Sequence, residues 1–279
     1  MQPVQSNCPS CGNVFVDTFC SRCGEKRISP HDFAIKYFVE EGIEGFTHFD
    51  NKFLRTMKLL LFRPGQLTKS YFEGKRVPYM KPFQLFIVCN ILFFLFLGGG
   101  NPFSIRFNNF NGTPYSYFHT DKLIKSRANT TDKLAAYTTQ FNEKVSRQSK
   151  TFIIVIIPFL ALGLALIYLR KRRYFTEHLA FATHFFSFVL VYFLLVAYLV
   201  VLPVMYIGKV EFNSTGDYLL STFSIVILVI YFAVAGRRFY NISKWYTTLS
   251  TIFFLFLFAA AVLAYRLFLF YKIFYSIHL

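Results

Sequence analysis

Charge is scarce in this chain, and negative charge is the scarcest. Only 16% of the 279 residues are charged, and 14 acidic residues stand against 30 Lys or Arg, for a net charge of +16. An average soluble domain carries roughly 25% charged residues, whereas 54% of this chain is apolar and 20% is aromatic. The composition therefore argues against a soluble globular protein and predicts that lipid is its main solvent.

The signatures of common enzymes are also missing. The sequence contains no phosphate-binding glycine loop, no Gly-x-Ser-x-Gly and no His-Glu-x2-His pattern. Residues 1–7 lack the basic start and the apolar stretch of a signal peptide, so we expect the N-terminus to stay in the cytosol, where thiols remain reduced. These absences favour a non-enzymatic role.

The excess of Lys and Arg has two interpretations. A basic chain can bind nucleic acid. Here, however, the cations flank apolar runs, as they do beside membrane spans on the cytoplasmic side. We therefore expect the lipid bilayer, and not nucleic acid, as the partner.

Four of the five cysteines lie within the first 23 residues, in a C-x2-C-x8-C-x2-C pattern. Each Cys-x2-Cys pair places two thiolates on one tight turn, and four thiolates complete the tetrahedral shell that structural zinc prefers. A segment this short cannot bury a core, so the metal would supply its folding energy. We predict a zinc ribbon over residues 1–28, with a disulfide pair or a redox Cys-x2-Cys as the alternatives. Its ligands would be Cys8, Cys11, Cys20 and Cys23.

Residues 29–81 form a basic, amphipathic region. Asp50 can cap a helix over 51–62 that ends at Arg63-Pro64-Gly65, and a second helix should run from Gln66 to Glu73. Between 52 and 81 there are eight Lys or Arg and one acid, which suits helices in the headgroup layer of an anionic leaflet. The alternative is a small helical domain that packs on the chain's own spans. The cations expected at the interface include Lys52, Arg55, Lys58, Arg63, Lys75 and Arg76.

Residues 82–279 read as a transmembrane domain, because uncharged stretches of about 20 residues can cross a bilayer as helices. We predict an all-α polytopic membrane protein whose five spans cover about 83–100, 151–169, 179–206, 218–236 and 245–268. A helix after Thr131, with apolar residues at helical spacing, should run into the second span.

Short basic loops set the orientation. The Arg170–Arg173 run and the pair Arg237-Arg238 should lie in the cytoplasm. This leaves the N-terminus cytosolic and the C-terminus extracytoplasmic. The 101–150 loop would then lie outside despite eight Lys or Arg against three acids, which is tolerated because long loops follow the charge rule poorly.

Ionisable or polar groups inside a membrane are candidate functional sites because burying them is expensive. Glu177 and His184 are seven residues apart and share a helix face, whereas His178, which directly follows Glu177, lies well off that face. Such groups can bind a metal or relay protons. The plainer interpretation makes Glu177 a helix-start residue, His184 a hydrogen-bonded interior residue and Asn90 a contact between helices.

The order of motifs resembles an uncharacterised bacterial membrane family known only as a domain of unknown function. Its members join a zinc ribbon to a basic helical segment and several spans. The resemblance covers most of the chain and implies a location in the bacterial inner membrane, but no activity. It is carried by Cys8-Pro9-Ser10-Cys11-Gly12, Cys20-Ser21-Arg22-Cys23-Gly24, Arg55-Thr56, Arg63-Pro64-Gly65, Tyr71, Gly74-Lys75-Arg76, Tyr79, Pro82, Glu177-His178-Leu179, His184 and Phe188.

Three functions fit these patterns. The first is a non-enzymatic adaptor or regulator whose zinc ribbon and basic helices form a cytosolic docking face for a protein partner or anionic lipid, and the sequence is also compatible with a homo-oligomer. The second is a transporter, channel or lipid-handling protein that uses the polar intramembrane residues. The third, a membrane metalloenzyme built on Glu177, His178 and His184, has too few further ligands and the wrong helical spacing for His178.

Overall fold

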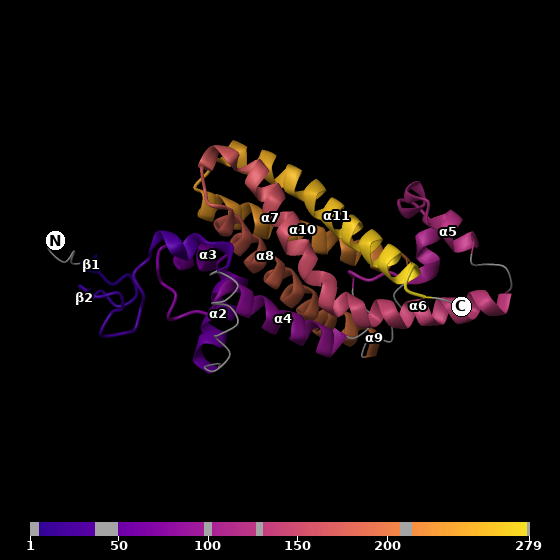
Figure 1. Cartoon of the computed structure of the whole chain (residues 1–279), viewed down its shortest axis with the longest axis horizontal. Coiled ribbons are helices and arrows are strands. Elements are labelled where there is room, and N and C mark those ends of the chain that lie inside the picture. Colours follow the sequence, from indigo (N-terminus) through magenta and orange to yellow (C-terminus); the bar gives the residue numbers. More distant parts are fainter. Residues whose placement is uncertain (1–5, 37–49, 98–101, 127–130, 207–213, 278–279) are drawn as a thin grey trace.

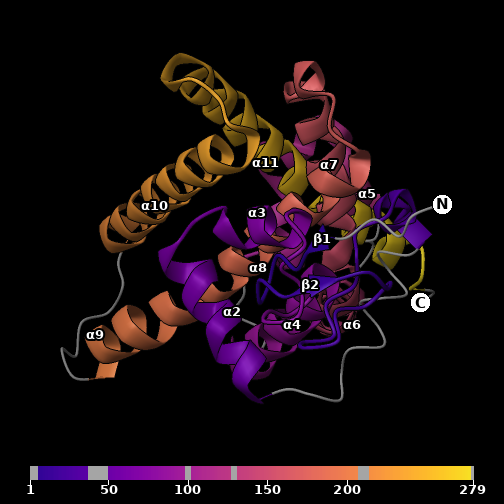
Figure 2. The same cartoon turned by 90° about the vertical axis from the view of Figure 1, so that its left-hand side faces the viewer.

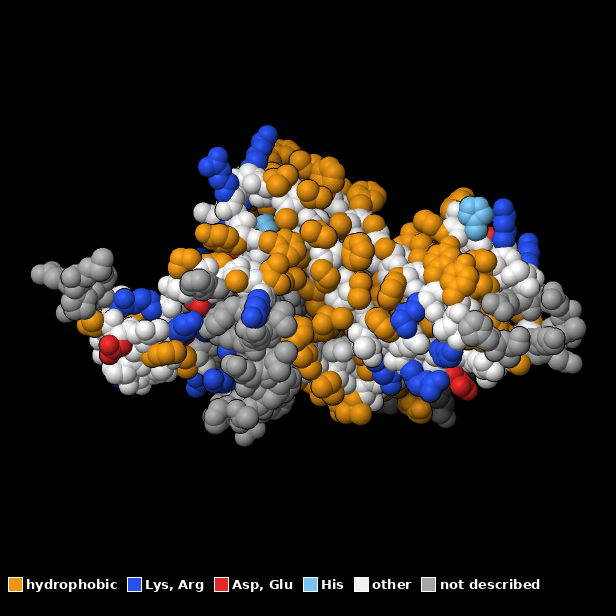
Figure 3. Space-filling model, in the orientation of Figure 1, with side chains coloured by type: hydrophobic (Ala, Val, Ile, Leu, Met, Phe, Trp, Pro, Cys, Tyr) orange, Lys and Arg blue, Asp and Glu red, His pale blue; other side chains and the backbone are white. Residues whose placement is uncertain are grey.

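The computed structural model describes residues 6–36, 50–97, 102–126, 131–206 and 214–277. The molecule is elongated (Figure 1). The N-terminal segment lies at one end, long helices run through the middle, and helix α5 (Thr120–Ser126) and the start of helix α6 (Thr131–Phe152) lie at the other end together with the C-terminus. Hydrophobic side chains cover much of the middle on the face shown in Figure 3, while Lys and Arg gather towards the two ends.

The cysteine-rich segment folds around two short antiparallel strands, β1 (Ser6–Asn7) and β2 (Val14–Phe15), with Ser6 opposite Phe15. An isolated bridge joins Phe19 to Lys26. A short 3-10 helix, η1 (Pro30–Phe33), follows. Gly12 and Gly24, which close the two cysteine turns, have φ of +75° and +72°, a conformation that glycine adopts without steric penalty.

The basic region contains the two expected helices, α2 (Asp50–Phe62) and α3 (Gln66–Phe72). The turn between them falls at Arg63-Pro64-Gly65, as predicted, and Gly65 has a φ of +75°. An added Cβ at Gly65 would lie 2.4 Å from the carbonyl oxygen of Ala235, so this turn approaches the backbone of helix α10 (Ser214–Tyr240) directly. The predicted cap by Asp50 stays a prediction, because the side chain of Asp50 lies outside the part of the chain that the structure describes.

Within the described ranges, four helical segments are long and apolar enough to cross a membrane, by length and composition: Leu134–Ile167, Phe175–Tyr206, Gly216–Tyr240 and Lys244–Phe274. The first combines α6 (Thr131–Phe152), the 3-10 turn η5 (Ile153–Val155) and α7 (Ile156–Ile167). The second combines α8 (Phe175–Val196), the π-helical turn η7 (Ala197–Val201) and α9 (Leu202–Tyr206). The others are α10 (Ser214–Tyr240) and α11 (Lys244–Phe274).

The remaining predicted span, 83–100, appears as the shorter apolar helix α4 (Pro82–Leu97). Its 16 residues extend about 24 Å, less than the ~30 Å of a typical hydrocarbon core. Residues 98–100 lie outside the described part of the chain. The multi-pass prediction is therefore supported for four helices, and the fifth span is not confirmed.

Helix α8 is the centre of the bundle, because nearly every residue from Thr176 to Leu190 is buried. It packs against α4 on one side and α7 on another. Figure 2 views the molecule from the end that carries the N-terminal cysteine-rich segment. In this view α3 lies between α10 on one side and α7 on the other. The neighbouring face of α7 meets α11, where a Cβ at Gly163 would lie 2.1 Å from Leu257.

The 101–150 segment, predicted as one extracytoplasmic loop, has its own helices and apolar core. The 3-10 turns η3 (Phe107–Asn111) and η4 (Tyr115–Phe118) and helix α5 (Thr120–Ser126) pack with α6 against the end of α11. Tyr137 and Phe141 are fully buried there, and α6 continues towards α7, as the helical spacing predicted. Residues 101 and 127–130 are outside the described ranges, as is the side chain of Thr131.

Candidate functional site

The four N-terminal cysteines converge on one point. Their sulfur atoms all lie within 4.8 Å of one another, with Cys8 Sγ 3.5 Å from Cys23 Sγ and Cys11 Sγ 3.6 Å from Cys20 Sγ. Four sulfurs at ~2.3 Å from a tetrahedral metal would be ~3.8 Å apart. None of the four is in a disulfide, so the group has the geometry to hold a metal ion.

The thiols differ in acidity. Burial raises the pKa of Cys23 to about 12. Burial would also raise the pKa of Cys20, but hydrogen bonds from the backbone of Arg22 and Cys23 outweigh it and lower the pKa to about 6. One sulfur is thus favoured as a thiolate before any metal arrives, and a bound cation would displace the protons from the others.

The cysteine cluster is fastened to the helical part of the chain by Glu25, which directly follows the second cysteine turn. Its side chain is 1% exposed. One carboxylate oxygen accepts a hydrogen bond from the Ser10 hydroxyl at 2.5 Å and from the backbone N–H groups of Arg76 and Val77 at 3.0 Å each. A buried carboxylate with three donors is well compensated, so it joins both cysteine turns to the segment after α3.

A second buried acid, Asp32, strengthens the same junction. Its carboxylate lies 3.1 Å from Lys26 Nζ and 3.5 Å from the Arg76 guanidinium, and it accepts the Ser29 backbone N–H at 2.9 Å. Burial alone would raise the pKa of Asp32, but these three partners outweigh burial and hold the pKa below its ordinary value. The carboxylate is therefore stable in its charged form.

Arg76 is not at the surface, contrary to the sequence-based expectation of an interfacial cation. It is 7% exposed, its guanidinium lies 4.7 Å from the Tyr71 ring centre, and it faces Asp32 because the buried acid needs a compensating charge. Four of the other predicted cations are exposed and Lys52 is half-buried. The exposed four are Arg55, Lys58, Arg63 and Lys75.

The predicted intramembrane residues do not form one site. Glu177 pairs with Arg173 at 2.6 Å and accepts the Tyr174 N–H at 2.9 Å, which is the capping-box arrangement of a helix start. His178 Nδ1 lies 2.8 Å from the Tyr240 hydroxyl. Among the described residues, the only group of three or more acidic, His or Cys side chains placed to hold a metal is the cysteine cluster.

His184 and Asn90 contact different neighbours. His184 Nδ1 lies 2.9 Å from the Thr68 hydroxyl of α3, while its Nε2 is buried and has no hydrogen-bond partner among the described residues. Asn90 donates its side-chain N–H to the Lys150 carbonyl at 3.2 Å. Asn90 thus joins α4 to α6, as a contact between helices, and His184 fastens α8 to the basic helix α3.

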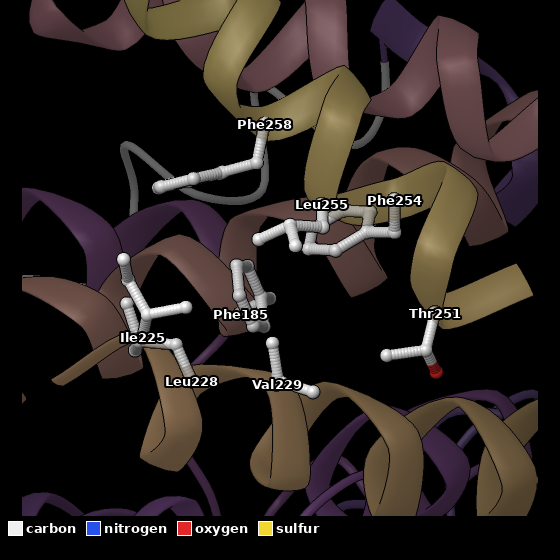
Figure 4. Close-up of a pocket in the computed structure, with 8 residues that line it drawn as sticks. All are labelled: Phe185, Ile225, Leu228, Val229, Thr251, Phe254, Leu255 and Phe258. Atoms are coloured by element: carbon white, nitrogen blue, oxygen red, sulfur yellow. The ribbon is translucent and has the colours of Figure 1, made fainter. Parts of the chain in front are cut away.

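Of the hollows beside the described helices, two lie against α8 or its N-terminal end. One, of about 70 Å³, is lined only by apolar side chains and Thr251 from α8, α10 and α11 (Figure 4). The other, of about 350 Å³, lies where α3, the start of α8 and the end of α10 meet, and it is lined by both cations and aromatic rings. Neither hollow is lined by the candidate intramembrane residues Glu177, His178, His184 and Asn90.

Sequence reasoning missed the buried acids and their partners. Glu25 and Asp32 look like ordinary surface acids in a hydrophilic segment, and nothing marks Thr68 or Tyr240 as the partner of a histidine. A usable signal is the scarcity of acids itself, because only two occur between Cys23 and Phe33 and both are buried.

Comparison with known proteins adds one family match. Residues 50–94, which comprise α2, α3 and most of α4, match a family described as a protein of unknown function (DUF3667). This agrees with the resemblance to an uncharacterised domain family over that segment. No curated protein and no solved structure matches the chain.

Proposed function

We propose that this chain is a multi-pass membrane adaptor whose cysteine cluster holds a structural zinc ion and presents a rigid docking face to a protein partner. The supporting observation is the junction built by Glu25, Asp32 and Arg76. Because these buried contacts fix the ribbon to the helices, a partner that binds the ribbon is held in a defined position at one end of the membrane domain.

The outer face of the ribbon suits a protein partner. Val14 is 55% exposed, Val16 is 40% exposed and Phe19 is 57% exposed. Exposed apolar side chains on a small module are candidates for an interaction site, and the metal would keep the module folded without a large core beneath.

Zinc is the metal that the cluster suits best. Four thiolates in a tetrahedral arrangement favour zinc, or an iron–sulfur centre, over harder cations. Four protein ligands also fill the coordination shell, which suits a structural and not a catalytic role. Metal analysis of the purified chain should find about one zinc per protein.

The membrane topology that goes with this role has five crossings, the N-terminus in the cytosol and the C-terminus outside, in a bacterial inner membrane. Helices α4, α8 and α11 run away from the ribbon end in Figure 1, and α6–α7 and α10 run back towards it. The Arg170–Arg173 run, Arg237 and Arg238 then share the ribbon end, in keeping with the positive-inside rule.

Labelling tests this topology. A cysteine that replaces Tyr117, which is 76% exposed at the far end, should react with a membrane-impermeant maleimide in intact cells. A cysteine that replaces the exposed Arg172 should react with the same reagent only after the cells are permeabilised. The reverse pattern would refute the proposed orientation.

A pull-down with the full-length tagged chain tests the docking role. The Val14→Asp/Phe19→Asp variant should lose a partner that the wild type captures, while its zinc content stays unchanged. The matched control is Asp17→Asn/Thr18→Ala, which alters two exposed polar residues of the same loop and should keep the partner. Recovery of the same proteins with both variants would refute docking through this face.

The alternative function is transport, and His184 supports it. A buried polar atom without a partner costs about 1–3 kcal/mol, and such a cost inside a membrane is often retained for function. His184 Nε2 is in this position on α8. Proteoliposomes under a pH gradient should show a proton flux that His184→Gln abolishes if the chain is a proton-coupled transporter, and no flux if it is not.

A further inference from the structure

The hollow where α3, the start of α8 and the end of α10 meet carries a proposal of its own. It measures about 350 Å³, within the ~300–1,000 Å³ of small-ligand sites. Its lining brings together three cations from three separate helices or their ends, Lys69, Arg173 and Arg238, with a single acid, Glu73. Three positive charges against one negative charge leave the lining itself at +2, and the ion pair between Arg173 and Glu177, which lies outside the lining, lowers the net charge of the site to +1. We propose that this hollow binds the phosphate of an anionic phospholipid headgroup.

The two arginines, Arg173 and Arg238, are oriented by hydrogen bonds but still have N–H groups that can bind a ligand. Arg238 donates one N–H to the Pro64 carbonyl at 2.6 Å. Arg173 bonds Glu177 at 2.6 Å and the Phe239 carbonyl at 3.3 Å. A guanidinium has five N–H donors, so these bonds orient each fork and leave other N–H groups for an oxyanion. Preoriented guanidinium groups are well suited to phosphate.

The acid in the lining does not neutralise the site. Glu73 lies 3.7 Å from Lys69 Nζ, and both side chains are nearly half exposed, so the pair is weak and screened by solvent. Lys69 can turn from Glu73 to a phosphate at little cost. Lys171 lies nearby, with its ammonium 2.8 Å from the carbonyl of Asn241, another lining residue, and adds positive potential.

The position and the walls favour a lipid over a free anion. The hollow sits at the ends of α8 and α10, where Tyr174 is 60% exposed and Trp245 is 87% exposed. Exposed Tyr and Trp at helix ends are typical of the headgroup level. The rings of Phe72 and Phe239 line the same hollow and offer an apolar surface to a glycerol backbone, which a bare phosphate does not need.

The inference depends on the membrane placement of the chain and not on its docking role. The sequence pattern predicts that the basic region over 29–81 lies along the headgroup layer as a whole. The proposal instead places one headgroup in a defined hollow lined by α3, the start of α8 and the end of α10. None of the cations first expected at the interface lines this hollow.

A lipid titration tests the proposal. The full-length protein in an uncharged detergent is titrated with dioctanoyl phosphatidylglycerol, dioctanoyl phosphatidylcholine or inorganic phosphate, and bound ligand is counted by native mass spectrometry. Phosphatidylglycerol should bind the wild type about tenfold more tightly than phosphatidylcholine, because only the former carries net negative charge into a basic site. Inorganic phosphate should bind more weakly than phosphatidylglycerol.

Paired variants locate the site. Lys69→Gln/Arg238→Gln should weaken phosphatidylglycerol binding about tenfold or more, since each cation near a headgroup contributes several-fold. The control Arg237→Gln/Lys244→Gln removes two exposed cations at the same end that do not line the hollow, and it should change binding less than about twofold. Arg238→Lys keeps the charge but not the guanidinium fork, so its affinity should lie between those of the wild type and of Lys69→Gln/Arg238→Gln. Such partial retention separates a loss of binding from misfolding.

Three results would overturn the inference. Equal losses in the two double variants would assign the binding to general positive charge. Equal affinity for the two lipids would remove the anionic requirement, and equal affinity for inorganic phosphate would make the ligand a soluble anion. If Val14→Asp/Phe19→Asp captured the same partners as the wild type while phosphatidylglycerol still bound, the docking role would be refuted and the lipid site would stand.

Discussion

Replacing Glu25 by alanine tests whether the ribbon and the membrane domain are one unit. The Glu25 carboxylate accepts hydrogen bonds from the Ser10 hydroxyl and from the backbone N–H groups of Arg76 and Val77. Alanine supplies no acceptor, so both N–H groups lose their partner in a region where Arg76 is buried. We expect the junction to open more often while the helices of the membrane domain stay folded.

The size of the effect follows from those two N–H groups. A buried donor left without a partner costs about 1–3 kcal/mol. Val77 is only half-buried, so water compensates part of its loss, and about 2–4 kcal/mol is a reasonable sum. Since 1.36 kcal/mol corresponds to a factor of ten, local opening should become about 30- to 1,000-fold more frequent.

Hydrogen exchange measured by mass spectrometry reports this opening. In the full-length protein, exchange of the peptides over 20–28 and 74–80 should accelerate in Glu25→Ala, while peptides from α8 should not change. Asp17→Ala removes an exposed acid of the same ribbon and should alter exchange less than about threefold. Exchange in Glu25→Ala that matches Asp17→Ala would refute the idea that Glu25 holds the junction.

Three further predictions concern the metal, pH and helix packing. Cys20→Ser should remove most of the zinc found by metal analysis, because three thiolates no longer close the shell; undiminished zinc would place the metal elsewhere. The pKa of Asp32 is lowered by folding, so its stabilisation is complete above about pH 4 and is lost as pH falls through the lower folded pKa. The rate at which pepsin releases the ribbon from the wild type, divided by the rate for Asp32→Asn, should therefore rise as the pH falls from 4 to 2, because this ratio cancels the pH dependence of pepsin itself. A ratio that does not change with pH would refute the role of Asp32. Gly65→Ala should lower the melting temperature in detergent by several degrees, because its Cβ would meet the Ala235 carbonyl at a positive φ. In Gly112→Ala the nearest atom to the new Cβ would be the Asn109 carbonyl oxygen at 4.0 Å, an ordinary contact, so this control should melt like the wild type.

Local pattern was enough to predict most of the helices. The turn at Arg63-Pro64-Gly65 and the helix over Gln66–Phe72 follow from proline and glycine chemistry, which acts within a few residues. The helix that contains Tyr137 and Phe141 follows from 3.6-residue spacing. The convergence of the four cysteines follows from their spacing, because two residues between thiols suit one turn around a metal.

The length of a span depends on more than apolar composition. An uncharged stretch predicted a crossing over 83–100, but the described helix has 16 residues. The second span reached further than its apolar run because α6 continues through η5 into α7. Hydropathy measures solubility in lipid, whereas backbone hydrogen bonding decides where a helix begins and ends.

The sequence by itself determined the apolar helices, their breaks and the grouping of the four thiols, because each depends on neighbours along the chain. Only the tertiary structure decided that Arg76 turns inward to Asp32, that Glu25 reaches a segment 51 residues away, and that His184 meets Thr68 across 116 residues. The physical reason is that a buried polar group takes its partner from whichever helix face packs against it, and spacing along one helix does not specify which face that is.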